Sequence, residues 1–193
     1  IKLFIMLQNI FQLNIWNVNL SLDLDQIKKE INTIVKLDKG RVISNQGGYQ
    51  SNNVKIEKFV QLSFLKEIIV RNTIEYKKNL GLKTESSLDN LWININNYKD
   101  FNISHMHPNS CISGVFYIQC LKESGQIVFE NSFKDYIGYA WDSKLNTYNQ
   151  NTSAKWKIVP EENKLLLFPS FLNHYVEPNL SKDKRISISF NVL

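Results

Sequence analysis

The sequence predicts a mainly β protein of the α+β class: a two-sheet jelly roll with supporting N-terminal helices packed on one sheet. Two patterns predict it. After about residue 88, short segments alternate apolar and polar side chains between turns, as in antiparallel jelly rolls and barrels. Between about residues 20 and 85, apolar side chains recur at helical intervals instead. We expect a single domain, residues 1–193, with helical support at about 20–85 and a jelly-roll core at about 88–193.

The N-terminal part of the chain predicts strands followed by two helices. Residues 2–18 are rich in Ile, Leu and Phe and are expected to form one or two strands, beginning with an edge strand rather than a signal peptide. Ser21 or Asp23 can cap a helix that continues to about Lys36. Residues 55–82 form a long amphipathic stretch, which predicts a helix on the outer face of a sheet.

The C-terminal half predicts the sheets. The expected strands cover residues 91–96, 103–107, 115–118, 126–130, 155–159, 164–168, 172–176 and 185–192. Residues 131–153 are polar, rich in Tyr, Asn and Ser, and have no clean period. We interpret them as a long loop or irregular hairpin that contributes to a substrate entrance.

Composition limits the classes of partner. The 193 residues are 43% hydrophobic and 12% aromatic, enough for a packed core. Scattered lysines produce the formal charge of +5, which gives no clear nucleic-acid signal but suits an anionic substrate. No apolar run reaches membrane-spanning length. Two cysteines, too far apart on one predicted strand to bridge, favour a reducing cytoplasm. A homodimer is compatible with the sequence.

The three histidines of the chain, His105, His107 and His174, all lie in two predicted strand regions. Alternate residues of a strand share a face, so His105 and His107 would emerge together, about 6–7 Å apart at the backbone. Two imidazoles at that spacing can bind one metal ion, and His174 can join from a neighbouring strand. Imidazole suits iron, zinc, copper and nickel alike. The alternative is that they are ordinary core or surface histidines.

Arg185 and Ser187 stand two residues apart on one predicted strand and so share a face. A guanidinium fork can bind both oxygens of a carboxylate, and a hydroxyl adds a further donor. A metal beside such a carboxylate anchor is the chemistry of a site that binds a keto acid.

Several motifs in combination resemble one known family. They are Y-x5-S-H-x-H-P-x-S-x-x-S-G-V-x-Y from Tyr98, S-G-x-I-x-F from Ser124, L-L-L-F-P-S-x-L-x-H-x-V-x-P from Leu165, and R-I-S-I-S-F-N from Arg185. This pattern is similar to the 2-oxoglutarate and Fe(II)-dependent oxygenases of phages and marine bacteria. The resemblance runs from about Ser44 to the C-terminus. It implies the double-stranded β-helix form of the jelly roll, Fe(II) as cofactor, and 2-oxoglutarate and O₂ as co-substrates.

The resemblance also implies roles for individual residues. His105 and His174 would bind the metal, and Arg185 would bind the distal carboxylate of 2-oxoglutarate with help from Ser187. His107 stands where the family has an aspartate. His107 can be the third ligand, or it can lie outside the ligand set while a water binds the metal in its place. In a third alternative, a carboxylate from elsewhere in the chain binds the metal instead. The candidate carboxylates are Glu130 and Asp135, and the candidate further contacts of the co-substrate are Tyr98, Tyr117, Asn94 and Asn96.

The segment Ser44–Ser51 has two compatible interpretations. Gly47-Gly48 permits positive φ and predicts a turn. The same segment resembles the family as well, which implies a loop over the mouth of the site where Tyr49 and Gln50 contact substrate.

The implied reaction is hydroxylation of a small molecule or a protein side chain, with release of succinate and CO₂. Two other classes of protein remain open from the sequence. One is a cupin-type metalloprotein without a keto acid, although the glutamate that cupins carry shortly after H-x-H is absent. The other is a non-catalytic jelly-roll module that serves a phage in binding or assembly.

Overall fold

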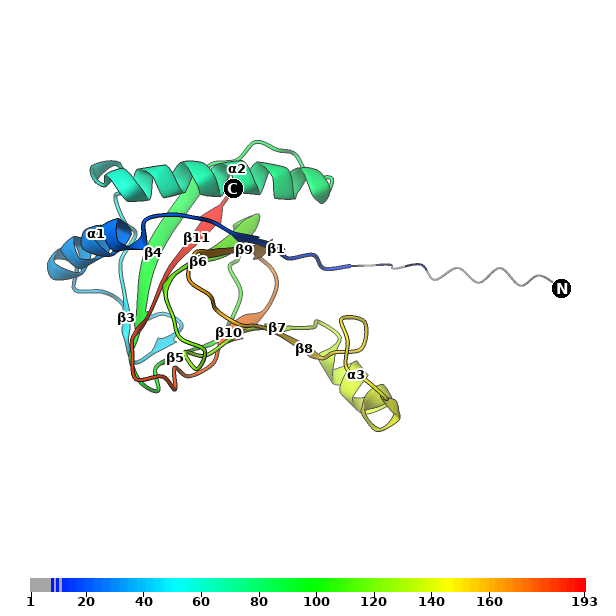
Figure 1. The fold of residues 1–193 in the computed structure, drawn as a ribbon. Coiled ribbons are helices and arrows are strands. Elements are labelled where there is room, and N and C mark those ends of the chain that lie inside the picture. Colours follow the sequence, from blue (N-terminus) through cyan, green and yellow to red (C-terminus); the bar gives the residue numbers. More distant parts are fainter. Residues whose placement is uncertain (1–7, 9, 11) are drawn as a thin grey trace.

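Two antiparallel sheets face each other in the computed structural model, which describes residues 8, 10 and 12–193 (Figure 1). The larger sheet has six strands in the spatial order β1 (Trp16–Asn19), β9 (Lys164–Pro169), β6 (Ile112–Gln119), β11 (Arg185–Val192), β4 (Leu88–Asn96) and β3 (Tyr49–Gln50). The smaller has five, in the order β2 (Asn45–Gln46), β5 (Phe101–His105), β10 (His174–Val176), β7 (Ile127–Glu130) and β8 (Lys155–Ile158). This is the predicted jelly roll.

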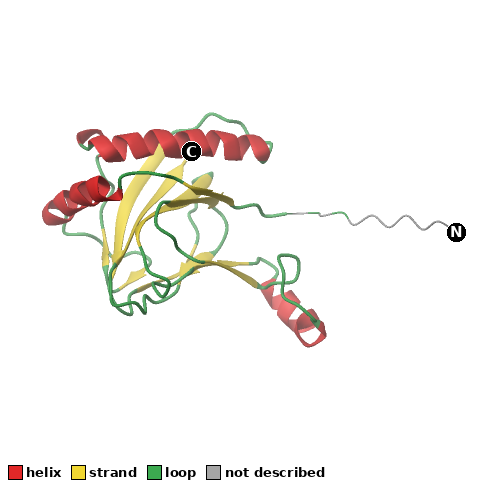
Figure 2. Ribbon diagram, viewed as in Figure 1, coloured by secondary structure: helices red, strands yellow, loops and turns green. Residues whose placement is uncertain are grey.

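Two helices cover the larger sheet, as predicted (Figure 2). Helix α1 (Leu24–Leu37) begins at Asp23, whose carboxylate accepts two backbone N–H groups of the first turn. Helix α2 (Val60–Asn79) follows a short 3-10 turn, η1 (Ile56–Lys58), and has no capping side chain of its own. Instead, Glu30 of α1 accepts the backbone N–H groups of Gln61 and Leu62, which ties the two helices together.

The main apolar core lies between these helices and the outer face of the larger sheet. Alternation along the strands explains it, because every second side chain of β4, β6, β9 and β11 is apolar and points to the helices. Its fully buried members include Ile27, Ile31, Leu62, Leu65, Ile69, Leu91, Ile93, Phe116, Ile118, Leu165, Leu167, Ile188 and Phe190.

A second, smaller core and a polar cavity that borders it lie between the inner faces of the two sheets. The smaller core includes Val115, Tyr117, Phe129, Leu166 and Phe168. On β4 and β11 the inward positions are instead polar, and the two strands pair so that Arg185 lies opposite Asn96 and Ser187 opposite Asn94. The cavity therefore has a wall of amides, hydroxyls and one guanidinium.

The turn predicted at Gly47-Gly48 is confirmed. It joins β2 to β3, and both glycines have positive φ, at 72° and 65°. A Cβ at Gly48 would lie 2.5 Å from the backbone oxygen of Ile95, so the close approach of β3 to β4 also requires glycine there.

Three predictions of local structure are corrected or limited. Residues 131–153 contain helix α3 (Lys134–Trp141) and the 3-10 turn η2 (Asp142–Lys144), and α3 projects away from the two sheets beside β8 (Figure 1). None of these residues lines the cavity, so the predicted substrate entrance there is wrong. Of the strands predicted in residues 2–18, β1 at the edge of the larger sheet is found, whereas residues 1–7, 9 and 11 lie outside the described part.

None of the helices in the described part of the chain combines the length and the apolar character that a membrane span requires. Both cysteines are free, with Cys111 exposed and Cys120 buried.

Candidate metal centre and keto-acid pocket

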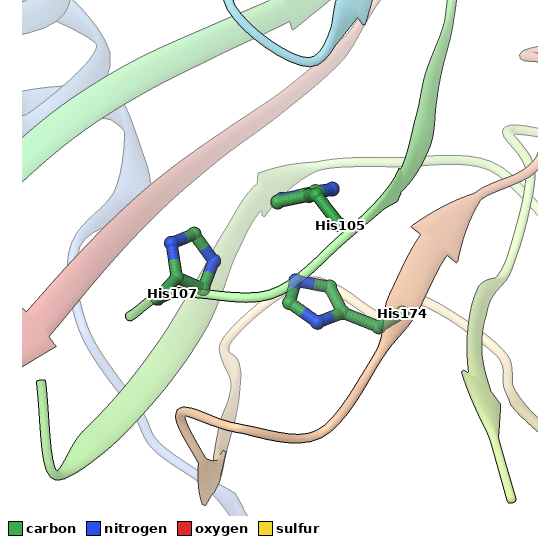
Figure 3. Close-up of side chains that lie close together, drawn as sticks. All are labelled: His105, His107 and His174. Carbon is green, nitrogen blue, oxygen red and sulfur yellow. The ribbon is translucent and has the colours of Figure 1, made fainter. Parts of the chain in front are cut away.

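The three histidine rings meet inside the jelly roll (Figure 3). His105 is the last residue of β5 and pairs directly with His174, the first residue of β10. Their ring centroids are 4.4 Å apart, and the ring of His107 lies 5.0 Å from His105 and 5.2 Å from His174. One nitrogen of each ring lies within 4.8 Å of the others. Three imidazoles so arranged can bind one metal ion.

His107 reaches this cluster differently from the predicted way. Strand β5 ends at His105, so His107 lies in the loop before β6 and does not share a strand face with it. The backbone N–H of His107 donates to the carbonyl oxygen of Ser170 at 2.9 Å, and its ring packs near Trp92, with centroids 5.6 Å apart. A loop contact therefore brings in the third imidazole.

Two backbone carbonyls fix the orientation of two of the rings. Nδ1 of His105 lies 2.7 Å from the oxygen of Ile103, and Nδ1 of His174 lies 2.8 Å from the oxygen of Leu172. A carbonyl only accepts, so Nδ1 carries the proton in both rings and Nε2 keeps its lone pair. Metal-binding histidines typically donate the N–H of the ring nitrogen that does not bind the metal to an acceptor of this kind.

Burial keeps the cluster neutral. Desolvation, aided by the neighbouring His105, lowers the pKa of His107 to about 4 and that of His174 to about 3. Desolvation likewise lowers the pKa of His105. All three imidazoles are therefore uncharged at neutral pH and can each offer a lone pair. The donor set fits a divalent transition metal such as Fe(II), and it does not select iron among those metals.

Arg185 lies in the same cavity, which has a volume of about 590 Å³. Its side chain is 2% exposed, and Nη1 donates to the backbone oxygens of Ser124, Gly125 and Glu177. No carboxylate of the described residues forms an ion pair with it. Desolvation lowers its pKa, yet a guanidinium stays charged at neutral pH. A buried cation held only by carbonyls is an anchor for an anionic ligand.

Most of the predicted co-substrate residues also line this cavity. Ser187, Asn94, Asn96 and Tyr117 all face it. Asn94 donates to Ser189, whereas the side-chain oxygen of Asn96 is buried without a partner. Desolvation raises the pKa of the Tyr117 phenol, so its hydroxyl keeps its proton and can donate.

Tyr98 and Tyr49 do not line the cavity, contrary to the prediction. Tyr98 lies in the turn between β4 and β5, is 58% exposed, and has the Lys99 ammonium over its ring. Tyr49 and Gln50 are neighbours on β3, so their side chains point to opposite faces, and only Gln50 faces the cavity.

The alternative in which a carboxylate replaces His107 does not fit the structure, because neither candidate carboxylate lines the cavity. Glu130 accepts a hydrogen bond from Ser104 at 2.6 Å and pairs with Lys134 at 2.9 Å, and these contacts lower its pKa. It does not line the cavity. Asp135 lies on the exposed helix α3 and is equally remote from the lining. Among the described residues, the metal-ligand cluster consists of the three histidines.

Sequence reasoning missed a polar network below the cluster. Ser113 donates to the side-chain oxygen of Asn191 at 2.7 Å and lies 2.8 Å from the hydroxyl of Ser170. Asn191 in turn donates to Asn90. Because the carbonyl of Ser170 holds His107, this network supports the loop that carries the third imidazole. Part of the signal was available, since Asn191 is a polar residue of the strand predicted at 185–192, whereas Asn90 and Ser113 precede the strands predicted at 91–96 and 115–118.

Three imidazoles and a buried guanidinium in one cavity of a double-stranded β-helix define a candidate non-haem metal site with a carboxylate anchor. Comparison with protein families agrees with this class. The family described as "Putative 2OG-Fe(II) oxygenase" matches residues 90–191. The chain belongs to this family of 2-oxoglutarate and Fe(II)-dependent oxygenases, which confirms the resemblance predicted from the motifs. No curated protein matches the chain.

Solved structures of low sequence identity share the fold. A prolyl-4-hydroxylase of Pseudomonas putida is 11% identical, with a TM-score of 0.64, and the match covers 93% of this chain and 92% of that one. The viral collagen prolyl hydroxylase of Paramecium Bursaria Chlorella virus-1, in its 2OG complex, is 10% identical, with a TM-score of 0.60 and coverage of 92% and 94%.

A prolyl hydroxylase from Trichoplax adhaerens, in complex with a hypoxia inducible factor peptide fragment, is 14% identical. Its TM-score is 0.65, and the match covers 93% of this chain and 83% of that one. At these identities the likeness establishes the double-stranded β-helix fold and leaves the substrate to be argued from the cavity.

Proposed function

We propose that the protein is an Fe(II)- and 2-oxoglutarate-dependent dioxygenase that hydroxylates an organic substrate and releases succinate and CO₂. The observation that carries the proposal is the meeting of three neutral imidazoles with Arg185 in one cavity. The cupin alternative explains the imidazoles but gives no role to a buried guanidinium. A non-catalytic jelly roll explains neither feature, because burying unpaired polar groups costs stability.

His105, His107 and His174 would hold the metal. When bound, Fe(II) supplies the activation of O₂ that is coupled to oxidative decarboxylation of the keto acid. One oxygen atom of O₂ would enter succinate and the other the hydroxylated product. Three protein ligands leave further coordination positions open, as this chemistry requires.

The side chains around Arg185 would hold the co-substrate. The guanidinium already donates through Nη1 to three carbonyls, which orients its remaining N–H groups before any ligand arrives. The distal carboxylate of 2-oxoglutarate is the ligand that such a group suits, and Ser187, on the same strand face, adds a hydroxyl donor. The NH₂ group of Asn96 and the protonated hydroxyl of Tyr117 complete a set of neutral donors around one cation.

His107 changes the charge of the site. An aspartate at this position would add one negative charge, whereas a neutral imidazole adds none. The site is therefore more positive by one charge than one with the H-x-D pattern, and we infer that it binds the dianionic 2-oxoglutarate more tightly. A cavity of about 590 Å³ favours a small molecule or a single side chain as the substrate to be hydroxylated.

The test is anaerobic addition of Fe(II) and then 2-oxoglutarate. Wild-type protein should develop a visible absorbance only when both are present, and under air it should form succinate and CO₂ in equal amounts. Arg185→Leu should bind Fe(II) as wild type does and bind 2-oxoglutarate more weakly by roughly 2–5 kcal/mol. Arg71→Leu, at an exposed position on α2, is the matched control and should change neither.

Metal binding without any response to 2-oxoglutarate would favour the cupin alternative, and binding of neither would favour a non-catalytic module. Unchanged keto-acid affinity in Arg185→Leu would remove the assigned role of that residue.

A further inference from the structure

Gln50 is a buried amide with no partner among the described residues. Its side chain is 3% exposed and lines the cavity, and its Oε1 atom is fully buried without a hydrogen bond. No described residue forms a hydrogen bond with its Nε2 group either, although neighbouring Asn94 is bonded to Ser189. A buried amide left unbonded destabilises the fold by roughly 1–3 kcal/mol. Such a group is expected where a ligand provides the missing partner.

Arg41 is next to Gln50 and also has a buried side-chain atom without a hydrogen-bond partner. The backbone N–H of Arg41 donates to the carbonyl of Gln50 at 2.8 Å, so the two residues are neighbours across adjoining segments. The Arg41 side chain lines the same cavity, and its Nε is buried without a hydrogen-bond partner. Among the described residues, no carboxylate forms an ion pair with it.

This pair lies on a different wall of the cavity from the Arg185 guanidinium. Gln50 is on β3, two strands away from Arg185 on β11, which corresponds to roughly 10 Å across the sheet. The head of Arg185 is held at Ser124, Gly125 and Glu177, on the side of β7 and β10. One five-carbon keto acid that bridges the histidines and Arg185 would therefore leave Arg41 and Gln50 free.

The charges of the lining favour one kind of group. Besides the histidines and tyrosine, the ionisable residues that line the cavity are Arg41, Arg185 and Asp89. Asp89 is exposed near the start of β4, five residues from the partner of Gln50, or roughly 16 Å along the strand. Among the side chains that line the cavity, Arg41 is thus a cation with no carboxylate close to it. A carboxylate supplies a single charge and a planar pair of oxygens, whereas a neutral amide supplies no charge and a phosphate supplies nearly two.

We propose that Arg41 and Gln50 form a second anion subsite, which binds a carboxylate of the substrate to be hydroxylated. The inference rests on the proposed oxygenase function and names the substrate class as carboxylate-bearing small molecules. Arg41 donates through its guanidinium. Gln50, whose amide no internal bond holds, turns its NH₂ group toward the second oxygen.

The experiment uses protein loaded anaerobically with Fe(II) and saturating 2-oxoglutarate, so that Arg185 is already occupied. The probe is 4-fluorobenzoylglycine, followed by ¹⁹F NMR, and the matched neutral probe is its primary amide. Inorganic phosphate serves as a competing anion. The acid should bind at least about tenfold more tightly than the amide, and phosphate should compete weakly.

Three variants assign the binding to this pair. Arg41→Gln should weaken the acid probe by about 10- to 100-fold, and Arg41→Lys by less. Gln50→Glu keeps nearly the same shape but places a carboxylate beside Arg41, so it should abolish binding of the acid. Arg71→Gln on α2 is the control and should bind as wild type does. The 2-oxoglutarate absorbance should be unchanged in every variant.

Equal binding of acid and amide, no binding of the acid, or indifference to Arg41→Gln would each overturn the subsite. These results differ from a failure of the proposed function, which would appear as wild-type protein that does not bind 2-oxoglutarate. In that case the same titration in the Arg185→Leu background still decides the matter, because Arg41 is then the one Lys or Arg side chain left among the described residues that line the cavity. Should Gln50→Glu fail to fold, the two Arg41 variants carry the test.

Discussion

The two faces of the larger sheet have opposite chemistry although the same strands build them. On β11, Ile186, Ile188 and Phe190 face the helices, whereas Arg185 and Ser187 face the cavity. Strand β4 repeats the pattern. The apolar face is covered by α1 and α2 and belongs to the main core, while the polar face retains atoms without partners. Alternate residues of one strand therefore serve different purposes: those that face the helices stabilise the fold, and those that face the cavity are available for binding.

The largest effect is expected from breaking the inner face at the histidines. His174→Ala should abolish binding of Fe(II), because two imidazoles, one of them on a loop, hold a labile ion poorly. Calorimetric titration with Fe(II) under anaerobic conditions measures it. Tyr175→Ala alters the next residue of β10 and should keep wild-type metal affinity, as its ring lies under the Lys155 ammonium. Retained binding in His174→Ala would contradict the assigned cluster.

Breaking the outer face should affect stability alone. Phe116 is fully buried under the helices, so Phe116→Ala should lower the free energy of unfolding by about 3–5 kcal/mol. Urea denaturation measures the loss, and the protein that remains folded should bind Fe(II) and 2-oxoglutarate normally. Ser189→Ala, on the inner face of β11, removes the acceptor of Asn94 and should reduce stability by only about 1 kcal/mol. Similar losses for both variants would erase the contrast between the faces.

The histidine cluster should make the metal-free protein acid-sensitive. Burial places the pKa of His107 at about 4 and that of His174 at about 3, below the value of about 6.5 expected in an unfolded chain. The unfolded chain therefore binds more protons between these limits. Stability is therefore full above a pH of about 6.5, falls progressively as the pH drops below that value, and stops falling only near the folded pKa values of about 4 and 3.

Urea denaturation at a pH of about 7.5 and of about 4.5 should show a loss of a few kcal/mol. Replacing His107 and His174 together by Gln should flatten the dependence. A wild-type profile that stays flat would mean that the rings are more accessible to water than their burial indicates.

The smallest effect on binding is expected at Glu130. Its carboxylate is engaged by Ser104 and Lys134 outside the cavity, so Glu130→Gln should leave Fe(II) affinity unchanged. Stability should fall by about 1 kcal/mol, because the hydrogen bond from Ser104 loses its charged acceptor. Lys134→Ala, which removes only a half-exposed ion pair, should cost less. A clear loss of metal affinity in Glu130→Gln would restore this residue as a ligand.

Alternation along the strands explains what the sequence could predict. Alternation predicts most of the strands and the inward direction of Ser187, Asn94 and Arg185. The apolar faces of the two helices follow in the same way from the helical period. Spacing on a strand could also have separated Gln50 from Tyr49, which were both predicted to contact substrate although only Gln50 lines the cavity.

What could not be predicted depends on contacts distant in sequence. Strand β5 ends at His105, where its pairing with β10 ends. His107 is held near the cluster by a hydrogen bond from its backbone N–H to the carbonyl of Ser170. Tyr98 is turned outward by a tight turn that Asp100 closes through the backbone N–H of Asn97. Helix α3 is only eight residues long and buries no side chain, so no contact with the core marks it as a helix.

The placement of His107 outside the sheets has an evolutionary consequence. An exchange at this position disturbs no ladder hydrogen bond, since the loop is held through its backbone N–H rather than through the ring. Histidine and aspartate can therefore replace one another here without rebuilding the scaffold around them. The charge of the metal cluster therefore depends on one residue that can change while the fold stays the same.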